Sequence, residues 1–196
     1  MAEWQLFEPG TVPEWTTSGW YAGRDRAPHL EQDAHKARLH LAADMVAQTA
    51  TELRLNTVVD LGAGDGGLLS LLKDAGLTAW GYDLQPSNIA GALERGVDVR
   101  LGDVVAGDIV WAGIAVATEM LEHLLDPHAF VARVAAARCR VLVASSPAWE
   151  TGHSHYEFHT WAWDYDGYRA LLEQGGYEVV RHEDAGGFQV ALGVLR

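Results

Sequence analysis

A glycine-rich turn follows a short apolar run near residue 60, and its residue types suit a nucleotide-type ligand. Residues 58–67 read Val-Val-Asp-Leu-Gly-Ala-Gly-Asp-Gly-Gly. Glycines tolerate positive φ angles and let the backbone approach a ligand closely. A strand that runs into such a turn and then into a helix places the turn at the carboxyl edge of an open α/β sheet, where ligands bind. The pattern therefore predicts a cofactor site at this turn.

The spacing of the turn fits two kinds of cofactor. Gly62, Gly64 and Gly67 match the GxGxxG pattern of dinucleotide-binding sites. Asp83 follows 21 residues after Gly62, where an acid would bind ribose hydroxyls. Spacing alone therefore leaves an NAD-type dinucleotide and S-adenosylmethionine (SAM) equally open.

Charge favours SAM over a dinucleotide. Between residues 55 and 94 the only basic residue is Lys73, whereas Asp60 and Asp65 lie in the turn itself. A pyrophosphate would therefore meet two carboxylates with little compensation. SAM carries no phosphate, and its ammonium and sulfonium groups are cationic. An acid immediately before the glycines would stabilise that ligand.

The elements around the turn alternate between short apolar runs and helical periods, which is typical of a parallel, doubly wound α/β sheet. The runs that predict buried strands are 57–61, 78–83, 97–101, 114–117 and 141–144, and the helical patterns between them are 67–75, 86–95 and 127–137. After a helix over 168–174, strands at 177–181 and 188–195 are joined by a short turn-rich segment. So short a connection makes them antiparallel neighbours.

The N-terminal part of the chain has a different character. Residues 1–27 contain prolines and glycines without a sustained period, which indicates a loop or short helices. Pro28 suits the first position of a helix, and apolar residues then recur at helical spacing as far as Leu53. We expect this long helix to cover one face of the sheet.

Composition and charge limit the class of protein and its partners. The chain has 196 residues, 48% of them hydrophobic and 21% charged, which suits one globular domain. Its formal net charge of −13 disfavours binding to nucleic acid or to anionic membranes. The first residues lack the features of a signal peptide, and no apolar run is long enough to span a bilayer. We therefore expect a cytoplasmic protein without a membrane anchor.

Four segments together resemble class I SAM-dependent methyltransferases. Residues 60–66 (Asp-Leu-Gly-Ala-Gly-Asp-Gly) resemble motif I of that family, and residues 81–84 (Gly-Tyr-Asp-Leu) resemble the acidic end of its second strand. Residues 102–104 (Gly-Asp-Val) resemble the segment that contacts adenine, and residues 117–127 resemble the stretch after the fourth strand in small-molecule members. The resemblance covers about residues 55–195. It implies a Rossmann-like, doubly wound seven-stranded sheet with an antiparallel C-terminal strand.

The resemblance also implies which residues bind the cofactor SAM. Asp60 and the backbone from Gly62 to Gly66 would hold the methionine moiety, and Asp83 would accept hydrogen bonds from both ribose hydroxyls. Leu84, Asp103 and Val104 would contact adenine. The full predicted set is Asp60, Gly62, Ala63, Gly64, Gly66, Asp83, Leu84, Asp103, Val104 and Glu119.

Two histidines are candidates for a general base. Methyl transfer depends largely on aligning acceptor and donor in a dry pocket, but a hydroxyl acceptor must also lose a proton. Histidine suits that task near neutral pH. Glu119 and His123 lie four residues apart near the expected methyl donor, and His159 is the strongest candidate in a later histidine-rich segment. We predict His123 and His159 as catalytic residues, and the acceptor atom (oxygen, nitrogen or carbon) stays open.

A second interpretation assigns the same region to a metal ion. Glu119, Glu122, His123 and His159 resemble the metal-binding set of the small-RNA 3′-terminal 2′-O-methyltransferases, in which two glutamates and two histidines hold a divalent ion. The net charge of −13 and the absence of a basic track oppose RNA binding. The main prediction therefore contains no metal, and the metal-dependent RNA enzyme is kept as an alternative.

The overall prediction is one methyltransferase domain over residues 1–196. Residues 1–54 would form an N-terminal helical lid with the long helix, and residues 55–196 the cofactor-binding core. The expected substrate is a small molecule, and the oligomeric state is left open. A non-catalytic, cofactor-binding regulatory domain is a further alternative, because an intact motif does not prove turnover. An aromatic lid over the acceptor is predicted from Trp15, Trp20, Tyr21, Trp163 and Tyr165.

Overall fold

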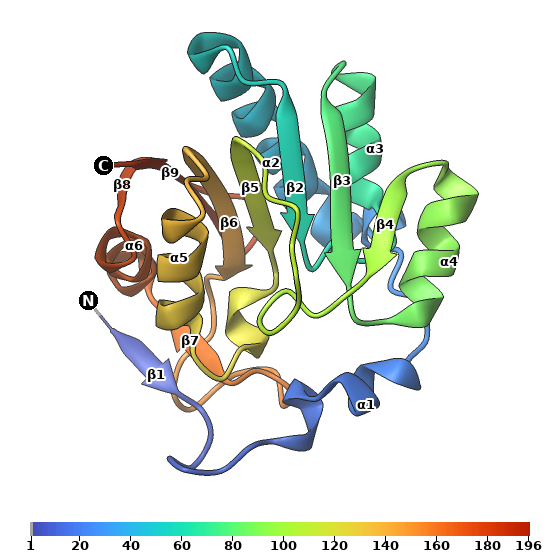
Figure 1. The fold of residues 1–196 in the computed structure, drawn as a ribbon. Coiled ribbons are helices and arrows are strands. Elements are labelled where there is room, and N and C mark those ends of the chain that lie inside the picture. Colours follow the sequence, from blue (N-terminus) through green and yellow to red (C-terminus); the bar gives the residue numbers. More distant parts are fainter. Residues whose placement is uncertain (1) are drawn as a thin grey trace.

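A seven-stranded sheet forms the centre of the computed structural model, which describes residues 2–196. Its strands are β2 (Thr57–Leu61), β3 (Thr78–Asp83), β4 (Asp98–Leu101), β5 (Ile114–Thr118), β6 (Val141–Pro147), β8 (Tyr177–Asp184) and β9 (Phe188–Leu195). The order across the sheet is β4-β3-β2-β5-β6-β9-β8. β2 to β6 pair in parallel, and β9 lies antiparallel between β6 and β8 (Figure 1). This topology confirms the predicted Rossmann-like sheet, including its antiparallel C-terminal strand.

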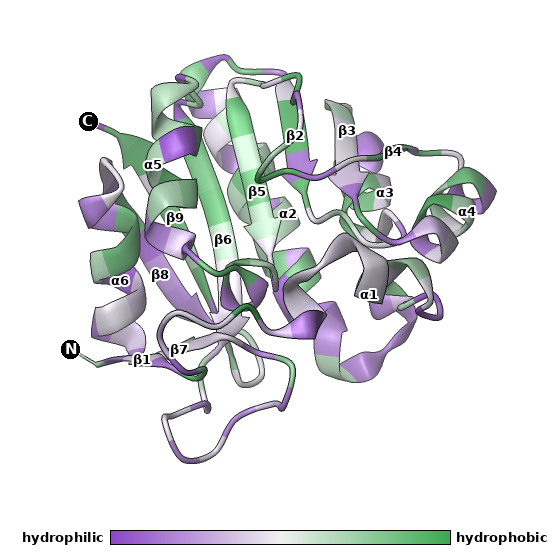
Figure 2. Ribbon diagram, turned by 60° about the horizontal axis from the view of Figure 1, so that its bottom comes forward, coloured by the Kyte–Doolittle hydropathy of each residue, from purple (hydrophilic) through white to green (hydrophobic). Residues whose placement is uncertain are grey.

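Helices cover both faces of the sheet. The long helix α2 (Asp33–Leu53) packs on one face with α3 (Gly67–Asp74) and α4 (Pro86–Arg95), whereas α5 (Pro127–Ala136) and α6 (Tyr165–Gln174) pack on the other (Figure 1). Every residue of β5 and β6 is buried, and Figure 2 shows both strands as strongly hydrophobic over much of their length. A parallel strand covered on both faces has no polar side, which explains why the sequence shows continuous apolar runs there.

A second, two-stranded sheet holds residues 3–5 against the rest of the fold, and no pattern in the sequence predicts it. β1 (Glu3–Gln5) pairs antiparallel with β7 (Trp161–Trp163), and Nε1 of Trp163 donates to Oε2 of Glu3 at 2.7 Å. Three-residue strands are too short to show a period. From β1 the chain passes beneath the carboxyl ends of the parallel strands through the short helix α1 (Ser18–Ala22) (Figure 1).

The prediction that Pro28 opens the long helix is wrong, because α2 begins at Asp33. Pro28 has a ψ of 71° and leads into a 3-10 turn over His29–Glu31, after which Gln32 is extended. The segment before α2 is bound to α4 instead, since the amide of Ala27 donates to Oδ1 of Asn88 at 3.2 Å.

Two smaller observations complete the fold. Cys139 is free and buried, as its apolar surroundings predict. Within residues 2–196, no helix is both long enough and apolar enough to cross a membrane.

Candidate active site

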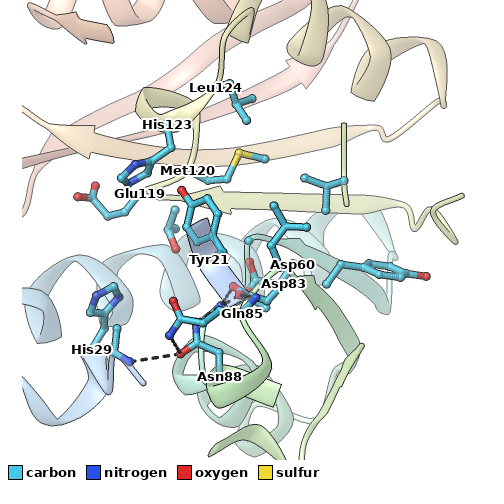
Figure 3. Close-up of a pocket in the computed structure, with 18 of the residues that line it drawn as sticks. Tyr21, His29, Asp60, Asp83, Gln85, Asn88, Glu119, Met120, His123 and Leu124 are labelled. Atoms are coloured by element: carbon cyan, nitrogen blue, oxygen red, sulfur yellow. Dashed lines mark hydrogen bonds between the residues drawn. The ribbon is translucent and has the colours of Figure 1, made fainter. Parts of the chain in front are cut away.

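One cavity of about 830 Å³ opens at the carboxyl ends of the parallel strands. The turn after β2, the end of β3 and the segment after β5 line it, and residues 16–29 cover it as an N-terminal roof. Tyr21 of this roof stands between two groups of side chains in Figure 3, Glu119 with His123 on one side and Asp60 with Asp83 on the other. A cavity of this size can hold a cofactor together with a small second ligand.

The turn after β2 is closely packed at one glycine and open at another. Gly62 and Gly64 have φ angles of 79° and 56°, which side-chain-bearing residues rarely adopt. The amides of Gly62 and Ala63 both donate to the carbonyl of Tyr82 at 2.9 Å, which ties the turn to β3. A Cβ at Gly62 would lie 2.7 Å from Cγ of Met120, whereas a Cβ at Gly64 would have no atom of residues 2–196 within 4 Å apart from its chain neighbours. Gly64 is therefore the point at which the backbone is open to a ligand.

Asp83 is held at the end of β3 by three hydrogen bonds. Its Oδ2 accepts from the amide of Gly64 at 2.8 Å, and its Oδ1 accepts from the amide of Gln85 at 2.8 Å and from Nδ2 of Asn88 at 3.3 Å. Burial raises the pKa of Asp83, and these hydrogen bonds oppose the rise by stabilising the carboxylate. A carboxylate fixed in this way can accept further hydrogen bonds from a pair of vicinal hydroxyls.

Asp60 has no such partners. Only 1% of the residue is exposed, and neither of its carboxylate oxygens has a hydrogen-bond partner among residues 2–196. Burial is the main cause that raises its pKa to about 7; the charge of Asp83 raises it further, and Arg38 opposes the rise. A buried carboxylate without a partner is costly for the protein, so its position in the cavity wall suits a cationic group of a ligand.

Asp60→Asn is expected to stabilise the ligand-free protein at alkaline pH. Native Asp60 keeps its proton up to about pH 7, whereas unfolded Asp60 loses it near pH 4, so its contribution to stability falls as pH rises through this window. The pKa difference corresponds to up to about 4 kcal/mol, which the neutral amide avoids. Thermal melting should therefore place the variant above the wild type at pH 8, with a smaller gap at pH 5. An identical gap at both pH values would show that Asp60 does not carry this buried charge.

The expectation that the carboxylates of the turn have little compensating charge is wrong for Asp65, which lines the cavity. Nη2 of Arg26 and Nη2 of Arg95 lie 2.9 and 2.7 Å from its Oδ2. Both arginines lie outside residues 55–94, where the sequence has Lys73 as its only basic residue, and the fold brings them to the turn. Arg26 also pairs with Glu94 on α4 at 2.7 Å, so these contacts fasten the N-terminal roof. Asp60 remains as the unpaired carboxylate of the turn.

Two histidines meet at the opposite end of the cavity. Nδ1 of His159 lies 2.7 Å from Oε2 of Glu150, and Nδ1 of His123 lies 3.1 Å from the carbonyl of Phe158. Because a carboxylate and a carbonyl only accept hydrogen bonds, both Nδ1 atoms carry a proton, and Nε2 presents a lone pair whenever the ring is neutral. Burial lowers the pKa of His123 to about 3, so this ring is neutral at ordinary pH. The two rings lie edge to face with centroids 4.6 Å apart.

A buried glutamate lies beside these histidines. One ligand atom from each of Glu122, His123 and His159 lies within 4.8 Å of the others. Glu122 is fully buried, neither of its oxygens has a partner among residues 2–196, and burial raises its pKa well above the usual range. Glu119 lies nearby and accepts from Oγ of Ser145 at 3.1 Å. Two nitrogen lone pairs and an orphaned carboxylate could hold a divalent ion, so these residues fit the metal-binding alternative.

The aromatic lid was predicted only in part. Trp20 and Tyr21 line the cavity, and the Trp20 ring packs against Phe158 with centroids 5.0 Å apart. The C-terminal half of the predicted lid is wrong. Trp163 is fully buried in the core, and Tyr165 donates to Asp184 outside the cavity at 3.3 Å.

Most of the predicted cofactor residues line the cavity, but one does not. Gly66 lies at the N-terminus of α3, where a Cβ would come within 2.4 Å of Cγ2 of Val97, so it serves close packing. Asp103 caps a turn, because its Oδ1 accepts from the amides of Val105 and Ala106 at 2.8 and 3.1 Å. The predicted residues that line the cavity are Asp60, Gly62, Ala63, Gly64, Asp83, Leu84, Asp103, Val104, Glu119, His123 and His159.

Sequence comparison identifies the family. A family model described as a methyltransferase domain matches residues 33–182, well over half of the chain. The chain belongs to this methyltransferase domain family. The matched region of the methyltransferase domain runs from α2 into β8 and so contains the glycine turn, Asp83 and both histidines. No curated protein matches the sequence significantly.

Solved structures of methyltransferases share the fold. Magnesium protoporphyrin IX methyltransferase from Synechocystis PCC 6803, crystallised with S-adenosylhomocysteine (SAH), is 16% identical, with 89% of this chain and 90% of that chain covered and a TM-score of 0.68. The methyltransferase domain of bacterial CtHen1-C is 21% identical, with 83% and 99% covered and a TM-score of 0.64. Human N-acetylserotonin methyltransferase in complex with SAM is 14% identical, with 81% and 51% covered and a TM-score of 0.63. At these identities the likeness establishes the fold.

Proposed function

We propose that the protein is a SAM-dependent methyltransferase that acts on a hydroxyl group of a small-molecule acceptor. One observation carries the proposal. A single cavity is lined by Asp60, Asp83 and His159, and Nδ1 of His159 lies 2.7 Å from Oε2 of Glu150. Figure 3 shows His123, whose ring packs on His159, on the other side of Tyr21 from Asp60 and Asp83. The family match and the neighbours crystallised with SAM or SAH support the choice of cofactor.

The cofactor half of the cavity suits an adenosyl amino acid. Asp83 would accept hydrogen bonds from the two ribose hydroxyls. The open space beside Gly64 would let the ligand approach the protein backbone closely. The orphaned carboxylate of Asp60 would pair with the ammonium group. When bound, SAM would supply a methyl group on a positively charged sulfur, and SAH would be the leaving group when that methyl group is transferred to the acceptor.

The histidine half of the cavity suits a hydroxyl acceptor. Nε2 of His159 is free to take the hydroxyl proton as the acceptor oxygen bonds to the methyl group. Glu150 then stabilises the imidazolium that forms, and the proton leaves to solvent after transfer. Trp20, Tyr21 and Phe158 cover this region with aromatic surface and exclude water.

The lining of the cavity favours a neutral or cationic acceptor over a polyanion. Among the described residues, seven carboxyl groups line it against three arginines, and six of the seven remain when Asp65, which is paired with Arg26 and Arg95, is set aside. Each phosphate of a nucleic acid would meet this excess of negative charge. We therefore favour a small hydroxylated compound as the acceptor.

Transfer of a labelled methyl group tests this function. The protein would be incubated with methyl-labelled SAM and three acceptor sets, namely hydroxylated small molecules, amines, and short RNA with a free or a phosphorylated 3′ end. We expect label in hydroxylated small molecules only. Label in RNA that requires the free 3′ end would replace this proposal by the RNA alternative. SAH binding without transfer to any acceptor would favour a regulatory, non-catalytic domain.

A metal-dependent RNA 3′-terminal 2′-O-methyltransferase is the second candidate. The grouping of Glu122, His123 and His159 favours it, because these residues offer the ligand types of a divalent-ion site. Elemental analysis of protein purified without chelator, together with transfer measured in chelator, separates the two candidates. A bound ion in near-equal proportion to protein and activity that chelator abolishes would support the second. Undiminished activity in chelator would exclude it.

A further inference from the structure

The loop between β6 and β7, residues 148–160, gives the cavity several aromatic rings. The residues of this loop that line the cavity are Trp149, Glu150, Tyr156, Phe158 and His159. Glu150 holds the loop together, because its Oε1 accepts from the amide of Tyr156 at 2.9 Å and its Oε2 lies 2.7 Å from Nδ1 of His159. One buried carboxylate therefore positions both an aromatic ring and the proposed base.

The aromatic rings form a continuous series that ends at the proposed base. The ring of Tyr156 lies edge to face with that of His159, with centroids 5.2 Å apart, and with that of Phe158, with centroids 5.3 Å apart. Phe158 packs in turn on Trp20 of the N-terminal roof. A ligand that lies against Tyr156 is thus beside the ring that would take its proton.

Two rings of the loop present a large free surface to a ligand. Trp149 is 55% exposed and Tyr156 is 43% exposed, although both line the cavity. Trp20 and Phe158 are half-buried against each other, and Cζ of Arg24 lies 3.9 Å from the centroid of the Trp20 ring. Exposed aromatic surface in the wall of a cavity is surface that a ligand can bury.

These aromatic rings, together with a histidine base, favour one class of hydroxyl compound. Aromatic rings gain free energy from one another beyond the area that they bury, whereas a saturated ring gains only from the area. A phenol ionises near about pH 10, as the tyrosine side chain does, so it gives its proton to an imidazole far more readily than an aliphatic alcohol does.

We propose that the acceptor is a neutral aromatic compound whose ring lies against Trp149 and Tyr156 and whose phenolic hydroxyl is directed to Nε2 of His159. This inference rests on the proposed function, since it names the class of acceptor for that function. The phenol oxygen bonds to the methyl carbon as the bond between that carbon and the sulfur of SAM breaks, and the electron pair of that bond stays on sulfur. The hydroxyl proton passes to Nε2 of His159, and the products are an aryl methyl ether and SAH.

Calorimetry with two matched probes tests this class of acceptor. 2-Naphthol and decahydro-2-naphthol share their carbon skeleton and the position of the hydroxyl, and only the first is aromatic. We expect SAH-loaded protein at pH 7 to bind 2-naphthol at least about 10-fold more tightly than decahydro-2-naphthol, and to transfer label from methyl-labelled SAM to 2-naphthol alone.

Two variants locate the aromatic contact. Trp149→Leu and Tyr156→Leu should each weaken 2-naphthol binding by about 3- to 10-fold, the range of one aromatic pair, while the affinity for SAH stays at its wild-type value. Tyr165→Leu is the matched control, because Tyr165 is also an exposed tyrosine but lies outside the cavity and donates to Asp184. It should bind both probes as the wild type does.

The order of the titrations separates this inference from the proposed function. Protein that fails to bind SAH in the first titration would overturn the proposed function and this inference with it. If SAH binds, equal affinity for the two probes, or binding of neither, would overturn this inference alone, and that comparison needs no variant to fold. An undiminished preference for 2-naphthol in both Trp149→Leu and Tyr156→Leu would also overturn it, because these rings would then not contact the acceptor.

Discussion

Asp83→Ala is expected to weaken SAH binding by at least about 100-fold, because it removes two charge-assisted hydrogen bonds to the ribose hydroxyls. The carboxylate is already oriented by the amides of Gly64 and Gln85, so the ligand meets it without rearrangement. The same substitution releases the amide of Gly64, which loosens the turn that borders the ligand. Isothermal titration calorimetry measures the loss.

Asp98→Ala is the matched control for this prediction. Asp98 lies on the neighbouring strand β4, is about half exposed and pairs with Arg100 at 2.6 Å on the surface. Its removal should leave SAH binding unchanged. Asp83→Ala protein that melts as a folded domain and keeps wild-type affinity would mean that the ribose is bound elsewhere.

His159→Ala is expected to lower methyl transfer to a hydroxyl acceptor by about 100-fold or more while SAH binding stays at its wild-type value. The ring lines the cavity, its Nδ1 lies 2.7 Å from Oε2 of Glu150, and it is outside the set of residues that we propose to bind the cofactor. Glu150→Gln should give a smaller loss of about 10-fold, because the amide keeps the shape of the side chain but not the charge that stabilises the imidazolium. Turnover at saturating SAM measures both effects.

His155→Ala is the control for the histidine prediction, because His155 lies in the same segment but is exposed, with its Nδ1 3.0 Å from the carbonyl of Tyr156. We expect wild-type turnover from it. Full activity in His159→Ala would remove the ring from the chemistry. Loss of a bound divalent ion from both His123→Ala and His159→Ala would instead support the metal-dependent candidate.

The central sheet could be predicted from the sequence because each parallel strand is buried on both faces. Such a strand appears as a short apolar run, and Ile114–Thr118 is the clearest example. The small sheet formed by β1 and β7 could not be predicted, since its strands have three residues each and pair across most of the chain. The start of α2 was misplaced because tertiary contacts of Ala27 and His29 decide the path before Asp33.

The glycine turn after β2 and its place in the cavity wall could be predicted because the motif is concentrated in a few neighbouring residues. The charges around it could not, since Arg26 and Arg95 reach Asp65 from outside the motif. Glu150 carries no motif of its own, and only the fold brings it within 2.7 Å of Nδ1 of His159. Contacts between distant segments, rather than local propensity, therefore set the electrostatics of this site.

A crystal structure of the protein grown with SAH tests the central claim most directly. We expect SAH in the cavity, with its ribose hydroxyls on Asp83, its ammonium on Asp60 and its sulfur directed towards the side of the cavity that holds His159. A cavity that stays empty at saturating SAH, or that binds a dinucleotide in its place, would contradict the account.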